Sequence, residues 1–174
     1  MTQLELCNLA LLKLGEQPLA NMNEESAPAK LARAIFPSLR NGLLCLYPWN
    51  FAIQEFDLVR TSGEFILPNG VLRVLEVSSD NYKINGRKIV CNAERLTLRA
   101  IIDPGENACP DWFCTLLASR LACEICLPLT DNQAMLKSLA EQFETEFKNA
   151  KFMDSASAKN PSGVKTFSLI DQRF

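Results

Sequence analysis

The spacing of apolar residues changes twice along this chain, and this change constrains the fold more than any other feature. Apolar residues recur at helical spacing near both ends, whereas the middle holds short β-branched runs separated by turn residues. The pattern predicts helices over residues 2–14, 27–47, 110–127 and 131–152, and a β region over residues 51–102. We therefore expect an α+β fold: helices at both ends packed as a small bundle, a central antiparallel β-sheet or hairpin region, and an extended C-terminal arm.

Residues at the ends of these segments support the predicted boundaries. Capping is expected at Thr2 with Glu5, at Ser26, and at Thr130 with Gln133. Gly15 is placed for a left-handed C-cap, the dipeptide Tyr47-Pro48 is expected to end the second helix, and Pro128 the third.

Two of the helices carry an apolar stripe that predicts which side faces the core. In the second helix the stripe consists of Leu31, Ile35, Leu39, Leu43 and Leu46. In the last helix it consists of Leu136, Leu139, Phe143, Phe147 and Ala150, which leaves Glu141, Glu144 and Glu146 on the expected solvent face.

The clearest signal in the middle of the chain is a hairpin. Asn85-Gly86 separates two short strand-like runs, which predicts a two-residue type I′ turn with positive φ at both positions. Leu96 to Arg99 then alternates apolar and polar residues, as a half-exposed antiparallel strand does.

The composition excludes several classes of function. The chain has 174 residues, with 18 basic and 20 acidic side chains, a formal net charge of −2 and no histidine. Without histidine there is no Ser-His-Asp or Cys-His catalysis and no His-ligated zinc. Glycine-rich nucleotide-binding motifs are also missing, so we expect no enzyme activity and no cofactor. The apolar stretches fall short of the about 20 residues that a membrane span needs, so no membrane partner is expected.

The seven cysteines offer one alternative function. Cys109, Cys114, Cys123 and Cys126 lie close in sequence, and the last two form a C-x-x-C pair. Because the pair falls late in a predicted helix and only one pair has this spacing, buried and reduced thiols are the favoured interpretation. The alternative is a thiol- or metal-dependent protein that uses the Cys109–Cys126 cluster. A regulatory protein that binds nucleic acid is a third hypothesis, which the acidic balance and the scattered basic residues disfavour.

The sequence divides into a single domain over residues 1–153 and a flexible C-terminal arm over residues 154–174. The arm begins with a polar stretch that cannot form a core and ends in a segment, Val164 to Phe174, that carries apolar residues. Such a segment either folds back on the domain or adds itself to a neighbour as a strand or helix, and the second is favoured.

A corner between the second helix and the β region carries a resemblance to a known family. The run from Ala29 to Pro37, then Arg40, Leu43-Leu44 and the corner Pro48, Trp49, Asn50 and Phe51, resembles the tail tubular protein A family of tailed phages. Members are head-to-tail adaptors, also called head completion or gatekeeper proteins. Shorter matches follow in order at Leu67-Pro68, Leu72 to Val74, Asn85 to Arg87, Leu96 to Arg99, Pro110 to Phe113, Leu117 to Ala122 and Leu127 to Thr130. The likeness spans about residues 4–153.

The resemblance implies a structural protein of the virion neck, made in the cytoplasm of a host bacterium. Its copies would be monomers or loose oligomers alone and would form a dodecameric ring on the portal protein. That ring would extend the DNA channel, pass the genome without sequence-specific binding, and hold the tail nozzle or tail tube protein. The candidate portal contact lies in the arm at Phe167, Leu169, Ile170, Arg173 and Phe174. The candidate contact for the tail or a neighbouring subunit is the hairpin tip at Asn85, Gly86 and Arg87.

Overall fold

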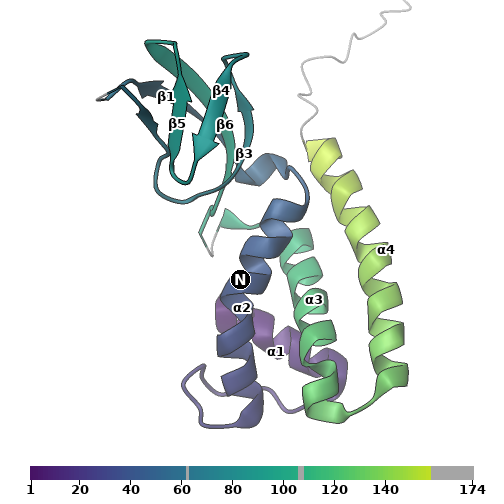
Figure 1. The fold of residues 1–174 in the computed structure, drawn as a ribbon. Helices are drawn as coiled ribbons and strands as arrows, with labels where there is room; N and C mark the ends of the chain where they lie inside the picture. Colours follow the sequence, from purple (N-terminus) through teal and green to yellow (C-terminus); the bar gives the residue numbers. More distant parts are fainter. Residues whose placement is uncertain (62, 106–107, 158–174) are drawn as a thin grey trace, which may run out of the picture.

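The computed structural model describes residues 1–61, 63–105 and 108–157, and it has the predicted α+β fold (Figure 1). Four helices form one body: α1 (Gln3–Leu14), α2 (Ala27–Leu46), α3 (Asp111–Thr130) and α4 (Gln133–Ser157). The strands form a second body beside the C-terminal end of α2. The expected arm contact at Phe167, Leu169, Ile170, Arg173 and Phe174 lies outside the described residues.

Helix α3 forms the centre of the bundle and packs against α1, α2 and α4. Its buried side chains face several directions, because neighbours cover it on several sides; they include Phe113, Leu116, Leu117, Leu121 and Ile125. By length and mean hydropathy, 1.4 over its best window, α3 could cross a membrane, so the expectation that every apolar stretch is too short is wrong. Because 61% of that window is buried inside the protein, α3 is accounted for as the core helix of the bundle.

The strands form two small antiparallel sheets. One has the order β1 (Ile53–Val59), β6 (Arg95–Ile102), β3 (Val71–Val77), and the other β2 (Phe65–Ile66), β5 (Lys88–Cys91), β4 (Tyr82–Asn85). The two sheets share a second apolar core, in which Phe65, Ile89, Leu96 and Leu98 are buried. Leu96 and Leu98 are buried while Thr97 and Arg99 are exposed, which confirms the predicted alternation along this strand.

The hairpin is confirmed, but its turn lies one residue further on than predicted. Asn85 pairs with Lys88, so the two turn residues are Gly86 and Arg87. Only Gly86 has a positive φ, of 59°, and Asn85 remains in the strand. One positive φ at the first turn position is the pattern of a type II′ turn, which places glycine there. The expected type I′ turn is therefore wrong.

The ends of α1 and α2 largely follow the sequence. Thr2 and Glu5 form the predicted capping box, and Gly15 adopts the left-handed conformation with φ 75°. Helix α2 ends at Leu46, and Tyr47 is extended before Pro48, as predicted. Ser26 occupies the N-cap position of α2 but makes no capping hydrogen bond there.

Two predicted boundaries of the later helices are wrong. Helix α3 continues past Leu127 to Thr130 and includes Pro128 in its last turn. Pro128 lacks the N–H of one helical hydrogen bond, but the next turn is kept, since the Asp131 N–H still donates to the Leu127 carbonyl at 3.0 Å. The expected Thr130–Gln133 capping box is absent from this turn: the Asn132 side chain accepts from the Met135 N–H at 2.9 Å and caps α4.

Helix α4 runs to Ser157, so residues 154–157 belong to the folded domain. The prediction that placed these four residues in the arm is wrong. The sequence there is polar, but helix continuation needs no apolar residue at every turn. Asp154 is 1% exposed and is held by the corner between α2 and β1. A polar contact therefore secures this last turn.

The buried side of α2 differs from the predicted stripe. Its buried residues are Ala29, Ala32, Phe36, Arg40, Leu43 and Leu44. Of the predicted stripe only Leu43 is buried; Leu31, Ile35 and Leu39 are half-buried and Leu46 is 60% exposed. Small residues such as Ala29 and Ala32 allow two helices to approach closely, which explains why α2 turns that side to the core. A second apolar face of α2 is left partly open.

Candidate functional site

The corner at Pro48, Trp49, Asn50 and Phe51 is a structural junction of the molecule. Trp49 is fully buried, and its indole N–H donates to the Leu43 carbonyl at 3.0 Å. Its ring contacts five other aromatic rings, at centroid distances of 4.8 to 6.4 Å: Tyr47, Phe51, Trp112, Phe113 and Phe147. These rings come from α3, α4 and both sides of the corner, so Trp49 fixes the helices relative to the start of β1.

Asn50 extends this junction to the end of α4. Its backbone N–H donates to both carboxylate oxygens of Asp154, at 3.0 and 3.2 Å, and its side-chain amide donates to Oδ2 at 2.8 Å. Burial raises the pKa of the Asp154 carboxyl, although the hydrogen bonds from Asn50 act in the opposite direction. Sequence reasoning missed Asp154 because it lies in a serine- and alanine-rich stretch with no apolar periodicity.

The hairpin tip is fastened to its own chain. One guanidinium nitrogen of Arg87 donates to the carbonyls of Leu67 at 3.0 Å and Pro68 at 2.8 Å, and to the side chain of Asn69 at 3.1 Å. Arg87 thus ties the turn to the loop between β2 and β3. The other two predicted tip residues, Asn85 and Gly86, are exposed, and in the described structure neither makes a side-chain hydrogen bond like those of Arg87.

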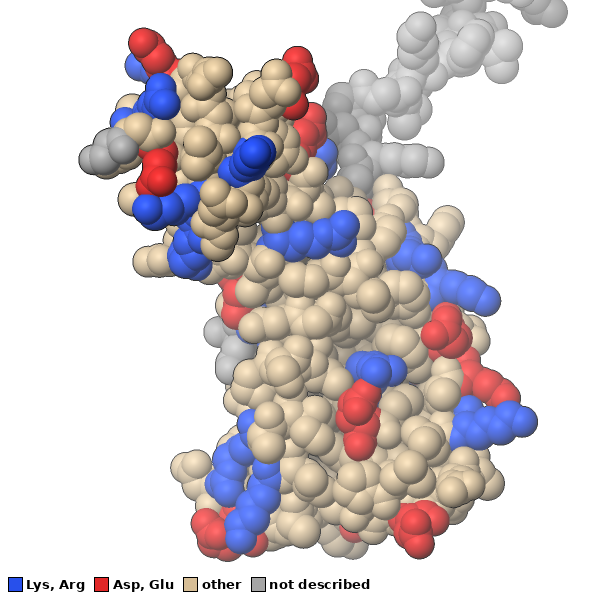
Figure 2. Space-filling model, in the orientation of Figure 1, with Lys and Arg blue, Asp and Glu red and all other residues tan. Residues whose placement is uncertain are grey.

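Other basic residues also act within the chain. Arg40 forms a two-pronged ion pair with Asp103 at 2.7 and 2.8 Å, and its side chain is 10% exposed. Arg33 donates to the Met22 carbonyl and Arg73 to the Cys45 carbonyl. On the face shown in Figure 2, blue and red groups are interspersed over the β region. This distribution gives little support to the nucleic-acid hypothesis.

The four clustered cysteines do not form a metal site. Within the described part of the chain, no group of three or more Cys, Asp or Glu side chains is placed to hold a metal ion. Burial raises the pKa of the Cys7 thiol to about 11 and also raises the pKa of the Cys114 and Cys123 thiols. Since the thiolate is the reactive form, burial makes these thiols poor nucleophiles.

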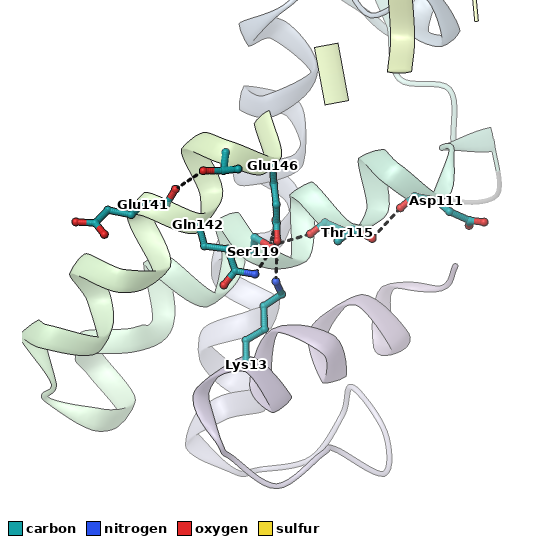
Figure 3. Close-up of polar contacts among 8 residues, drawn as sticks. Lys13, Asp111, Thr115, Ser119, Glu141, Gln142 and Glu146 are labelled. Atoms are coloured by element: carbon teal, nitrogen blue, oxygen red, sulfur yellow. Dashed lines mark hydrogen bonds and ion pairs between the residues drawn. The ribbon is translucent and has the colours of Figure 1, made fainter. Parts of the chain in front are cut away.

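A polar cluster between α1, α3 and α4 brings a serine, a carboxylate and a lysine together (Figure 3). Glu146 accepts from Lys13 Nζ at 3.1 Å, from Gln142 Nε2 at 2.8 Å, and from the Ser119 hydroxyl. The predicted solvent face is therefore wrong for Glu146, whose side chain is only 21% exposed, and right for Glu141 and Glu144. Because Ser119 is 1% exposed, a substrate cannot reach its hydroxyl, and the cluster joins three helices instead.

A groove between α2 and α4, lined also by residues of α3, hollows the described surface. Its volume is about 540 Å³. Its apolar lining comes from Ile35, Leu39, Leu43, Leu46 and Phe143. Arg120 and Glu124 form an ion pair at 2.5 Å beside them, and the Arg120 guanidinium lies 5.5 Å from the centre of the Phe143 ring. The groove lining therefore combines apolar side chains with the charged groups of Arg120, Glu124 and Glu144.

Comparison with known proteins adds no family assignment: no family model matches the chain, and no curated protein matches its sequence.

Proposed function

We propose that this chain is a structural adaptor of a tailed-phage virion, which forms a ring between the portal and the tail. The observation that carries the proposal is the corner around Trp49. The residues with the most specific resemblance to the tail tubular protein A family are the ones that hold the bundle and the β region together. A likeness concentrated at a structural junction supports a shared architecture, and the adaptor function is inferred from that likeness.

The distribution of exposed apolar side chains also supports assembly. A ring closes through two different patches on each subunit, repeated around the axis. This chain exposes large apolar residues on both of its bodies: Val59 and Ile66 on the strands are 67% and 59% exposed, and Leu12 and Phe152 on the helices are 59% and 73% exposed. Partners on two sides would cover such residues.

The proposal includes a non-enzymatic role in the virion neck. The dodecameric ring would dock on the portal protein, extend the DNA channel, and hold a tail nozzle or tail tube protein. No cofactor or metal is needed for this task. A weakly charged subunit fits a conduit, because a strongly basic lumen would bind the genome through counterion release.

An affinity pull-down of the tagged full chain tests the proposal. The chain is expressed together with the surrounding phage genes, and the recovered proteins are identified by mass spectrometry and imaged by negative-stain microscopy. Recovery of a portal with an added ring of density is expected. A monomer without any capsid or tail partner would contradict the adaptor function.

A matched truncation then tests the arm as the portal contact. The cut must follow Ser157, because a cut after Met153 would also remove the buried Asp154. The chain ending at Ser157 is expected to keep its far-ultraviolet circular dichroism spectrum and to lose the portal. Undiminished portal recovery would show that the contact lies elsewhere.

A further inference from the structure

The groove between α2 and α4 is lined by an apolar helix face that the fold leaves partly open. Leu39 and Ile35 are half-buried and Leu46 is 60% exposed. In Figure 2 the bundle surface is largely tan, with one blue and one red group side by side in its middle. An open apolar groove of this kind is typical of a site that receives a segment of protein chain.

Gly42 gives an independent reason to regard the groove as a binding site. It lies inside α2, where glycine is less favourable than alanine, and it lines the groove. A Cβ atom placed on Gly42 would meet no other atom within 4 Å, and its φ is not positive. Neither packing nor backbone conformation within the described chain therefore requires a glycine there. A bound segment that approaches the backbone of α2 would require one.

The end of this chain has the composition of such a segment. Residues 164–174 carry four large apolar side chains at Phe167, Leu169, Ile170 and Phe174. Lys165 and Arg173 outnumber Asp171 in this segment, and the groove offers the carboxylate of Glu144 beside the Arg120–Glu124 ion pair. Apolar anchors with an excess of basic residues would match an apolar groove with an acidic residue at its side.

The length of the connection also fits. With a helix rise of 1.5 Å per residue, Glu144 in the groove lies about 20 Å along α4 from Ser157. Residues 158–163, when extended, span at most about 20 Å. Val164 can therefore reach the level of the groove, and the apolar residues that follow can lie along it.

We propose that the groove formed by α2, α3 and α4 binds the C-terminal segment 164–174 of the same molecule. Leu39, Leu46 and Phe143 would provide the apolar contacts. This docking is proposed for the free chain; on a portal the same segment would leave the groove, because its apolar residues cannot occupy both sites at once.

Site-specific photo-crosslinking in the full chain tests the proposal. A benzoylphenylalanine replaces Phe167, the purified protein is irradiated, and mass spectrometry identifies the linked residues. Crosslinks within one molecule to the stretch 35–46 or to Phe143 are expected. The same photo-reactive residue at Tyr82, an exposed position on β4, should give no crosslink to this stretch.

Two Gly42 variants show whether the groove itself holds the segment. Gly42→Trp fills the groove and is expected to lower the crosslink yield about tenfold relative to the natural chain, whereas Gly42→Ala adds one methyl group at the point of approach and is expected to lower the yield less. Thermal unfolding of both variants checks that the bundle is intact. Equal yields in the two folded variants would overturn the proposal.

The identity of the crosslinked molecule decides the source of the segment. Mixing isotopically light and heavy protein before irradiation distinguishes links within one chain from links between two chains. Crosslinks found only in covalent dimers, or only outside the groove, would overturn docking within the same molecule.

Discussion

The buried carboxylate of Asp154 accepts hydrogen bonds from both the backbone and the side-chain amide of Asn50, a residue 104 positions earlier in the chain. Asn50 follows directly on Trp49, which is the centre of the aromatic cluster. The contact therefore joins the last described turn of α4 to the junction between the helices and the strands.

Replacing Asp154 by alanine is expected to lower the free energy of unfolding by about 2 kcal/mol, because the Asn50 N–H groups would lose their buried acceptor. Urea unfolding of the full chain measures the loss. Glu141→Ala is the control on the same helix, since Glu141 is exposed, and it should change stability by no more than about 0.5 kcal/mol. Similar losses in the two variants would show that the Asn50 contact contributes little.

The pH dependence of Asp154→Asn follows from the raised pKa of this carboxyl. Burial raises the pKa of this carboxyl in the folded state above its ordinary value of 3.8. At a pH between 3.8 and the folded-state pKa, the folded state therefore holds a proton that the unfolded state has released. The stability that Asp154 contributes is fully present below pH 3.8 and is lost as the pH rises through the folded-state pKa. The stability of the natural chain relative to Asp154→Asn should therefore decrease as the pH rises from about 3 to about 7. Urea unfolding across this range measures it, and a difference that increases with pH would contradict the raised pKa.

Asp103→Asn is expected to show the opposite sign. Burial acts to raise the pKa of Asp103, but the Gly105 N–H and the Arg40 guanidinium outweigh it and hold the pKa below 3.8. The stability from this carboxylate is present above pH 3.8 and is lost as the pH falls through the folded-state pKa. The natural chain should thus lose stability relative to Asp103→Asn on acidification below about pH 4, as followed by urea unfolding. Slopes of the same sign for Asp103 and Asp154 would contradict this assignment.

The sequence predicts those parts of the fold that depend on local chemistry. Thr2 with Glu5, Gly15 and the alternation around Leu98 each act over a few residues, and all three are confirmed. The face of α2 could not be predicted, because this helix has two apolar sides and only packing against α3 selects Ala32 and Phe36 over Leu39. Asp154 could not be predicted either, since its partner is far away in the sequence.

The candidate sites likewise combine contacts between near neighbours in the sequence with contacts that depend on distant residues. The contacts of Trp49 with Tyr47 and Phe51 lie between near neighbours in the sequence, whereas its contacts with Trp112, Phe113 and Phe147 depend on distant helices. The role of Arg87 was not predicted, since its acceptors belong to a different loop. The position of the turn depends on whether Asn85 remains in the strand. Asn85 pairs with Lys88 and therefore remains there, which places the turn at the next two residues.

The cysteines are expected to differ in reactivity according to burial. Cys45 and Cys109 are half-buried, whereas Cys7, Cys91, Cys114, Cys123 and Cys126 are buried. Brief treatment of the native protein with iodoacetamide at about pH 8 should modify only the half-buried pair, Cys45 more slowly because burial raises the pKa of its thiol, and denaturant should expose all seven thiols. Peptide mass spectrometry identifies the modified positions. Fast modification of Cys123 or Cys126 in the native protein would favour the thiol-dependent alternative.

The carboxylate of Glu146 is expected to stabilise the bundle mainly through its ion pair with Lys13. Both side chains are about four-fifths buried, so the charge pair is shielded from water more than a surface pair. Glu146→Gln keeps the size of the side chain and should lower the free energy of unfolding by about 1 kcal/mol, while the exposed Glu144→Gln serves as a near-neutral control. In a Lys13→Met background, Glu146→Gln should cost less, because the attraction that it removes is already lost. Urea unfolding of the single and double variants measures this coupling. An unchanged cost in that background would assign the stabilisation to the Ser119 hydroxyl instead.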